Sequence, residues 1–369
     1  LRLALTGQLG PAALAGEDVH AALALCVSCK ACRRECPTGV DMAKMKIEAT
    51  ASRVRVRGVA ARERLVAELP RYAGIARHFA PVLNWASRSG PVRQAGTKLG
   101  FAAGRQLPAW SARARRWDVG PETPNGDVLL FADTFNRTFE PENLRAAQFV
   151  LRAAGYRAVV PRQRLCCGRT YLSAGLVERA RAEARRTVAA LSQTGAEKLP
   201  VVGLEPSCLL TIRDEFRSLL PGAATDELAG RAVLLGEFLA GRELPAVQGR
   251  GRAHVHGHCH QKAFGAFEGT LKALRQVQGL DVTPIESSCC GMAGAFGYGA
   301  ETEEVSRAMG ERSLAPAVRA AAPDDWIVAD GTSCRHQIRD LTGRRAVHSA
   351  VLLARALQNT PDQLAAGGS

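Results

Sequence analysis

The spacing of apolar positions in this chain changes at about residue 127, and the change divides it into two parts. Downstream, short apolar runs alternate with longer stretches in which apolar residues recur at every third or fourth position. The runs predict buried strands, and the longer stretches predict amphipathic helices. Strands that alternate with helices in this way are typical of an α/β domain with a largely parallel sheet.

Upstream of residue 127 the pattern is helical. Residues 1–52 predict a helix, a cysteine-containing loop and a second helix, with Asp18 and Asp41 as the N-caps of the two helices. Proline and glycine recur through residues 53–126, which predict short helices in a basic linker. The expected fold class is therefore α plus α/β, with a helical N-terminal domain before the α/β region.

The α/β region contains an internal repeat. Its copies, residues 127–248 and 249–369, predict the same order of strands and helices, and the second ends in a C-terminal helix. In each copy Cys-Cys-Gly lies between the second strand and the second helix, and the third strand ends in Ser-Cys. The expected strands are residues 128–132, 158–160, 201–204, 253–257, 282–285 and 326–329, and the expected helices are 142–154, 176–191, 269–277 and 303–314.

Composition places the chain among globular proteins. It has 369 residues, of which 46% are hydrophobic and 23% charged, with no apolar stretch near the length of a membrane span and no signal-peptide pattern. Eleven cysteines in metal-like spacings predict reduced thiols and a cytoplasmic protein. Because the chain opens on Leu1 inside a helical pattern, we expect residues upstream of it.

The net charge of +14 comes mainly from arginine and is concentrated between residues 53 and 116. No aromatic stacking platform or DNA-binding motif accompanies it, which disfavours nucleic acid as a partner. A solvated helical face or a docking surface for an acidic partner is the preferred interpretation. A second one is peripheral contact with the inner face of the cytoplasmic membrane, through apolar residues that lie between two arginines. The apolar residues are Phe79, Val82, Leu83 and Trp85, and the arginines on either side are Arg77 and Arg88.

The N-terminal loop carries the most specific motif in the sequence. Cys26, Cys29, Cys32 and Cys36, followed by Pro37, form C-x2-C-x2-C-x3-C-P, the spacing with which bacterial ferredoxins hold [4Fe–4S] clusters. Since the fourth cysteine of such a run can ligate a neighbouring cluster, the first three require another ligand from elsewhere. A zinc knuckle or an oxidised pair fits four thiols at this spacing less well.

The two Cys-Cys-Gly motifs predict further metal ligands. Adjacent cysteines rarely pair with each other, and the glycine allows a positive φ at the turn. We expect the N-terminus of the following helix to favour the thiolate. Strand ends meet at one edge of a parallel sheet, so the second copy brings together Cys259, Cys289, Cys290 and Cys334. The first copy supplies only Cys166, Cys167 and Cys208, because Asp133-Thr134-Phe135-Asn136 stands where the fourth cysteine would fall.

Two other interpretations of these seven thiols stay open, namely inert buried cysteines and a structural zinc site in the second copy. Four histidines flank Cys259 at alternate positions and would share one strand face if the strand continued: His254, His256, His258 and His260. They could tune or ligate the centre, and His258 or His260 could take part in proton-coupled chemistry. Asp330 and Glu205 are expected to be solvated or hydrogen-bonded strand-end residues.

With both motifs in view, the chain resembles the iron–sulfur portion of FAD-linked 2-hydroxyacid oxidoreductases. These are of the glycolate oxidase, D-lactate dehydrogenase and D-2-hydroxyglutarate dehydrogenase type, related also to the iron–sulfur subunit of anaerobic glycerol-3-phosphate dehydrogenase and to the cysteine-rich subunit of heterodisulfide reductase. CVSCKACRRECPTGVDMAKMK is similar to the second ferredoxin motif of that family, and the tandem Cys-Cys-Gly repeats are similar to its cysteine-rich domain.

The resemblance implies an electron-transfer module that carries electrons from flavin to a quinone or another acceptor. We find no glycine-rich dinucleotide loop in the chain, so FAD is expected on a missing domain or a partner subunit. The resemblance also implies an iron–sulfur centre at the second set of four cysteines. A contrasting hypothesis is a zinc-holding scaffold without redox activity.

Overall fold

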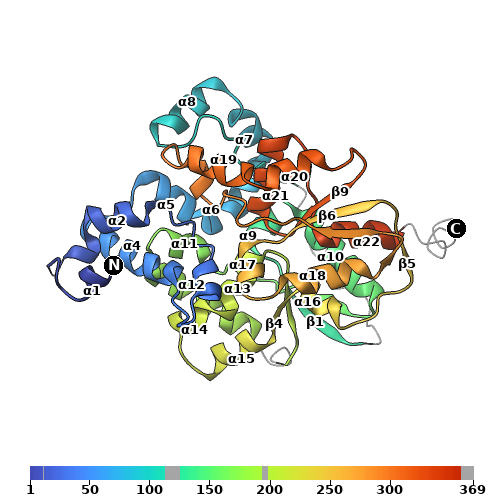
Figure 1. The fold of residues 1–369 in the computed structure, drawn as a ribbon. Coiled ribbons are helices and arrows are strands. Elements are labelled where there is room, and N and C mark those ends of the chain that lie inside the picture. Colours follow the sequence, from blue (N-terminus) through green and yellow to red (C-terminus); the bar gives the residue numbers. More distant parts are fainter. Residues whose placement is uncertain (11, 113–124, 193–197, 359–369) are drawn as a thin grey trace.

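The computed structural model describes residues 1–10, 12–112, 125–192 and 198–358 (Figure 1). Arg113, Arg115 and Arg116 of the basic segment and the last residues of the second repeat, 359–369, lie outside the described residues. The N-terminal part is helical, as expected. Its elements are α1 (Arg2–Leu5), η1 (Ala13–Ala15), α2 (Glu17–Ala24), α3 (Ala31–Glu35), α4 (Met42–Arg57), α5 (Ala61–Ala67), α6 (Leu69–Ala76), η2 (Arg77–Phe79), α7 (Ala80–Ala86) and α8 (Gly90–Lys98).

One of the two predicted helix caps is present. Asp41 caps α4, and its Oδ1 accepts hydrogen bonds from the backbone N–H groups of Ala43 at 3.0 Å and Lys44 at 3.2 Å. The prediction for Asp18 is wrong, because α2 begins at Glu17 and its N-cap is Gly16. Glycine is also tolerated at this position, so the nearest acidic residue is not a sufficient signal.

The first repeat is a parallel four-stranded sheet in the order β2-β1-β3-β4. Its strands are β1 (Asp127–Phe131), β2 (Arg157–Val159), β3 (Val201–Gly203) and β4 (Ala232–Leu234). The helices around it are α9 (Thr134–Thr138), α10 (Pro141–Ala153), α11 (Arg169–Ser173), α12 (Val177–Leu191), α13 (Pro206–Arg213), α14 (Glu215–Leu219), α15 (Ala223–Arg231) and α16 (Leu235–Ala240).

The second repeat is a parallel sheet in the order β8-β6-β9, beside a short ladder of β5 with β7. Its strands are β5 (Val247–Gln248), β6 (Arg252–His256), β7 (Val277–Gln278), β8 (Asp281–Pro284) and β9 (Trp326–Ala329). Its helices are α17 (Cys259–Ala263), α18 (Phe267–Arg275), η3 (Phe296–Tyr298), α19 (Glu303–Glu311), α20 (Leu314–Ala320), α21 (Thr332–Thr342) and α22 (Ser349–Gln358).

The two sheets share one strand arrangement. In each, the first strand of the repeat lies between the second and the third: β1 pairs with β2 and β3, and β6 pairs with β8 and β9. Predicted strands are displaced by at most one residue at either end. The helix expected at residues 303–314 is in fact two helices, α19 and α20, because the backbone of Ser313 leaves the helical conformation.

A continuous apolar core joins the repeats. Helices α10, α16, α18 and α22 lie between the two sheets (Figure 1), and their buried residues belong to one cluster. In α10, for example, Leu144, Ala147 and Leu151 are fully buried at helical spacing. The repeats are therefore packed against each other through helices, and this leaves the carboxyl ends of their strands free to carry the cysteine loops.

Candidate metal centres

The N-terminal cysteine loop, residues 26–36, connects α2 to α4 and contains α3. Ser28 and Lys30 have φ angles of 52° and 62°, so the backbone turns sharply between the cysteines. Burial raises the pKa of Cys29, and the sulfurs of Cys259, Cys26 and Cys32 raise it further. Cys29 thus has two thiols of its own motif and one thiol of the second repeat as neighbours.

Cys36 has different surroundings. Its Sγ lies 3.1 Å from the hydroxyl of Thr38, and this hydrogen bond, with backbone amides, lowers its pKa. Elsewhere in the motif Met42 donates its N–H to Sγ of Cys32 at 3.3 Å, while Lys46 Nζ donates to the backbone carbonyl oxygen of Cys26 at 2.6 Å and so holds the loop. Hydrogen bonds to sulfur tune the potential of an iron–sulfur cluster, so the N–H group of Met42 at Cys32 fits such a group.

A buried lysine fixes this loop to the first repeat. Lys30 is 1% exposed, and its Nζ lies 2.7 Å from Asp41, 2.8 Å from Asp214 and 3.0 Å from Glu215. Burial lowers the pKa of Lys30, but the surrounding carboxylates outweigh it and raise the pKa overall. Sequence reasoning missed this network, because a lysine between two cysteines carries no sign that acidic residues so far along the chain will surround it.

The second-repeat set, Cys259, Cys289, Cys290 and Cys334, is gathered at the carboxyl ends of β6 and β9 and in the loop after β8. Its sulfurs lie close enough for each to shift the pKa of the next, from Cys259 to Cys289, then to Cys290 and to Cys334. Gly291, with φ of 87°, makes the turn after the Cys-Cys pair, and its N–H points at Sγ of Cys289 at 3.4 Å. The structure thus brings together the four thiols predicted from the repeat.

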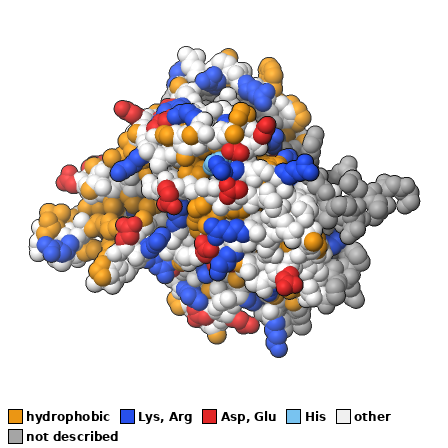
Figure 2. Space-filling model, turned by 45° about the vertical axis from the view of Figure 1, so that its right-hand side comes forward, with side chains coloured by type: hydrophobic (Ala, Val, Ile, Leu, Met, Phe, Trp, Pro, Cys, Tyr) orange, Lys and Arg blue, Asp and Glu red, His pale blue; other side chains and the backbone are white. Residues whose placement is uncertain are grey.

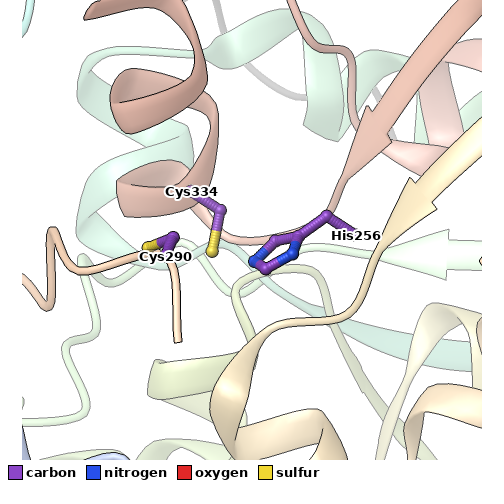
Figure 3. A group of neighbouring side chains, drawn as sticks. All are labelled: His256, Cys290 and Cys334. Atoms are coloured by element: carbon purple, nitrogen blue, oxygen red, sulfur yellow. The ribbon is translucent and has the colours of Figure 1, made fainter. Parts of the chain in front are cut away.

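His256 adds a nitrogen to this set. Its ring and the sulfurs of Cys290 and Cys334 offer ligand atoms that all lie within 4.8 Å of one another, and all three residues are buried. Figure 3 shows the Cys334 sulfur pointing into the space between Cys290 and the imidazole. Nδ1 of His256 is 2.8 Å from the Ser287 hydroxyl, while Nε2 is buried and has no hydrogen-bond partner among the described residues. A buried, unpaired ring nitrogen beside thiols fits a metal ligand.

The expected common face of the four histidines does not form, because β6 ends at His256. His254 lies 2.9 Å from Asp325, and His258 is the N-cap of α17, where its Nδ1 accepts from the N–H of His260 at 3.1 Å. His260 reaches out of the repeat, with Nε2 3.0 Å from the carbonyl oxygen of Ser28 in the N-terminal cysteine loop.

The first-repeat set, Cys166, Cys167 and Cys208, is also gathered and fully buried. The sulfurs of Cys166 and Cys208 both lie close enough to Cys167 to shift its pKa. Gly168, with φ of 74°, is the N-cap of α11. Thr134 begins α9 where Cys259 begins α17, so a hydroxyl occupies the place of the fourth thiol, and it lowers the pKa of Cys166.

The expected effect of helix N-termini is present in the first repeat but is outweighed: the backbone N–H groups of Gly168 and Arg169 lower the pKa values of Cys166 and Cys167, while burial and neighbouring thiols raise them more. A helix follows directly on the glycine in the first repeat but not in the second, where α19 begins only at Glu303. A hydrogen bond with the next thiol, followed by burial, raises the pKa of Cys166 and of Cys259. In the other five thiols a neighbouring sulfur lowers the pKa, but burial and further thiols raise it more. A bound cation reverses this balance, because a coordinating thiol is deprotonated.

The acidic strand-end residues are hydrogen-bonded, as expected, and both are buried rather than solvated. Glu205 caps α13 and also accepts from the backbone N–H of Thr332 at 2.8 Å, which joins the third-strand ends of the two repeats. Asp330 accepts from Gln261 at 2.9 Å, Thr270 at 3.0 Å and the N–H of Ser349 at 3.1 Å.

Comparison with known proteins identifies this arrangement. Residues 132–213 and 253–339 each match the cysteine-rich domain family. Lactate utilization protein A of Bacillus velezensis is 30% identical over 181 residues, which cover 46% of this chain and 74% of that protein. The chain belongs to the cysteine-rich domain family of iron–sulfur oxidoreductase components.

Two further relatives extend the family match toward the N-terminus. One is a subunit of the anaerobic glycerol-3-phosphate dehydrogenase of Escherichia coli K12, which is 29% identical over 293 residues, 76% of this chain and 73% of that protein. The other, D-2-hydroxyglutarate dehydrogenase of Pantoea ananatis, is 24% identical over 357 residues, 90% of this chain but only 34% of that protein. The family resemblance expected from the sequence is thus confirmed, and the chain is an oxidoreductase component with the character of an iron–sulfur electron-transfer module.

Proposed function

We propose that this chain receives electrons from a flavin-bearing partner subunit or domain and passes them through two iron–sulfur centres to a quinone-like acceptor. Cys26, Cys29, Cys32 and Cys36 would hold a [4Fe–4S] cluster in a ferredoxin-type N-terminal domain, and the second-repeat set would hold the other centre. Iron–sulfur clusters supply one-electron transfer. The chain's own residues fix where the centres lie and control the polarity around them.

The closeness of Cys29 to Cys259 is the observation that supports this proposal. Each of these residues belongs to a different thiol set, and the two are close enough for one sulfur to raise the pKa of the other. The hydrogen bond from His260 to Ser28 holds the same two segments together. A short path between the sets is what a relay requires, and a scaffold would have no need of it.

The N-terminal part offers surfaces for partners. Within the described residues, the exposed large hydrophobic side chains all lie between Leu3 and Leu107. In Figure 2 hydrophobic side chains, coloured orange, are most frequent on the left of the molecule, the side on which the first N-terminal helices lie in Figure 1. We assign this surface to the flavoprotein. The chain spans only about a third of D-2-hydroxyglutarate dehydrogenase, so the substrate would be oxidised outside it.

Peripheral membrane contact belongs to the same proposal. In the part of the chain that the structure describes, no helix is both long and apolar enough to cross a bilayer. Phe79, Val82 and Trp85 are 59%, 61% and 73% exposed on η2 and α7. Together with Arg77 and Arg88 they would suit the surface of an anionic membrane, which is where a quinone would be reached.

Zinc is the alternative occupant of the second-repeat set. A buried group of thiols with one imidazole is a donor set that zinc also prefers, and such a site would make the chain a scaffold without redox activity. The donor atoms alone do not separate zinc from iron, so the metal itself has to be measured.

The test is metal analysis of the full chain, purified without oxygen together with its flavoprotein partner. We expect iron with acid-labile sulfide and a broad visible absorbance. Cys29→Ser should remove the N-terminal centre and leave the repeats folded, and Cys290→Ser should remove the second centre and leave the N-terminal helices folded. Protein that contains zinc alone, or iron that neither substitution reduces, would overturn the proposal.

A further inference from the structure

The side chain of Lys262, in α17, extends to the loop that carries the second Cys-Cys pair. Its Nζ donates to the backbone carbonyl oxygen of Ser287, and lies 3.4 Å from the Ser287 hydroxyl and 3.2 Å from the carbonyl oxygen of Ser288. These two serines immediately precede Cys289. Because an ammonium group has three N–H donors and no acceptor, the three oxygens satisfy it fully in its charged form.

The same ammonium group lies beside the sulfurs of the second-repeat set. Burial lowers the pKa of Lys262, and three neighbouring sulfurs act in the opposite direction, as does the exposed Glu286. The sulfurs are those of Cys259, Cys289 and Cys334. Lys262 also lies close enough to His256 for its charge, after burial, to lower the pKa of that imidazole. A cation is therefore placed among the groups that would surround a metal.

The surroundings hold the lysine in this place. A Cβ at Gly257 would lie only 2.9 Å from Cε of Lys262, so the absence of a side chain there makes room for the lysine stem. The N–H of Lys262 donates to the carbonyl oxygen of His258 at 3.1 Å, and its own carbonyl oxygen accepts from Arg34 of α3 at 3.4 Å. Stem, backbone and ammonium group are all engaged, so the charge is fixed in position.

These contacts also decide which nitrogen of His256 carries the proton. The Ser287 hydroxyl donates its hydrogen to the carbonyl oxygen of Ile285 at 3.3 Å, and its oxygen accepts from Lys262. Since a hydroxyl has one hydrogen and two lone pairs, the 2.8 Å contact with Nδ1 of His256 must be donated by the imidazole. In the neutral ring Nε2 then has no proton, and its lone pair is available beside two buried sulfurs.

The corresponding residue of the first repeat is placed differently. Arg137 is the fourth residue of α9, as Lys262 is of α17, and its Nε donates to the carbonyl oxygen of Ala132 at 3.4 Å. Burial lowers the pKa of Arg137 to about 10 and Asp133 raises it, whereas sulfurs act on Lys262. Of the two repeats, the one with four thiols is thus the one whose lysine lies among sulfurs.

We propose that Lys262 is a positioning residue of the second centre, the one at the second-repeat set: it fixes the loop before Cys289 and raises the reduction potential through its charge. The inference rests on the proposed function, because it needs an electron-carrying metal at these thiols. A fixed cation stabilises a neighbouring group more strongly after that group has gained an electron. Charge and hydrogen bonds around the sulfurs set such potentials. Lys262 would thereby favour the passage of electrons onto this centre.

The test is a potentiometric titration of the full chain, purified without oxygen together with its flavoprotein partner and followed by electron paramagnetic resonance. Lys262→Gln keeps a donor for the serine oxygens but removes the charge. We expect reduction of the second centre to become about tenfold less favourable, equivalent to about 59 mV for one electron. Lys262→Arg keeps the charge and should stay close to wild type. Lys272→Gln removes an exposed charge from α18 and is the matched control, with an unchanged potential.

Iron content, measured in every variant, separates this inference from the proposed function. Wild-type iron with an unchanged potential in Lys262→Gln would overturn the inference alone, and an equal shift in Lys272→Gln would do the same, because net charge would then explain it. A wild-type chain without iron would refute both. Loss of iron in Lys262→Gln but not in Lys262→Arg would support the inference, since the charge would then be needed to hold the centre. Loss in both variants would contradict it.

Discussion

Nζ of Lys30 lies 2.8 Å from a carboxylate oxygen of Asp214, a residue 184 positions further along the chain. This ion pair, with Asp41 and Glu215 beside it, connects the N-terminal cysteine loop to the first repeat. It sets the loop on the repeats so that Cys29 comes near Cys259. The relation between the two thiol sets therefore depends on a lysine that binds no metal itself.

Replacement of Lys30 by methionine should lower the free energy of unfolding by about 3–5 kcal/mol, because it leaves buried carboxylates without their cation. Lys44→Met is the matched control. Lys44 binds the same Asp214 at 2.9 Å but is 36% exposed, so its loss should cost about 1 kcal/mol or less. Denaturant unfolding measures both values. Equal effects for the two lysines would contradict a structural role for the buried position.

The ion pair between Glu140 and Arg335, which joins the two repeats, should make the stability of the protein depend on acid pH. Nε of Arg335 donates to Glu140 at 2.8 Å. Burial raises the pKa of Glu140, but the guanidinium outweighs it and brings the pKa to about 2, from an ordinary 4.5. A carboxyl group whose pKa is lower in the folded state than in the unfolded state stabilises the fold. This stabilisation is complete at pH values above the unfolded-state pKa and is lost as the pH falls to the folded-state pKa.

Glu140→Gln should therefore be less stable than wild type by about 3 kcal/mol near neutral pH, and the difference should shrink between about pH 4.5 and pH 2. Urea unfolding at a series of pH values gives this comparison. Glu142→Gln is the control, because the ion pair of Glu142 with Arg345 is long, at 4.0 Å, and exposed to solvent. A difference between wild type and Glu140→Gln that stays constant down to pH 2 would refute the assignment.

His256 should be required by the centre at the second-repeat set. His256→Ala removes the buried Nε2 beside Cys290 and Cys334, so most of the metal bound at that set should be lost, or its spectrum should change. His254→Ala, two residues earlier on β6, breaks only the 2.9 Å contact with Asp325 and should retain both metal and spectrum. Metal analysis and electron paramagnetic resonance of the two proteins decide the matter, and matching spectra would exclude the imidazole as a ligand.

Gly291 should tolerate substitution far less well than Gly343. Both have positive φ, 87° and 71°, so alanine introduces backbone strain of about 1–2 kcal/mol at each. A Cβ at Gly291 would also overlap the carbonyl oxygen of Ser306, whereas no described atom lies within 4 Å of one at Gly343. We expect Gly291→Ala to cost at least about 3 kcal/mol and to reduce metal content. Thermal unfolding that shows similar losses for both variants would rule out the steric argument.

The sequence determined three strands of each repeat and the partners of each cysteine within its own repeat, but it did not predict β4, β5 or β7. Spacing along the chain predicted the strands, the glycine turns and the gathering of Cys259, Cys289, Cys290 and Cys334, because parallel strands end at a common edge. Local rules also found the cap at Asp41, while failing at Asp18, where glycine serves instead.

Only the tertiary structure decided how the repeats and the N-terminal loop meet. The burial of Lys30 and the approach of Cys259 to Cys29 join residues that are distant in sequence. The sequence named His256 as one of four alternating histidines. Only the structure showed that β6 ends at His256 and that this histidine, and not the other three, lies beside Cys290 and Cys334. The physical reason is that periodicity records which face of an element is buried. It does not record which distant side chain is buried beside it, and in this protein those contacts between distant side chains determine the electrostatics.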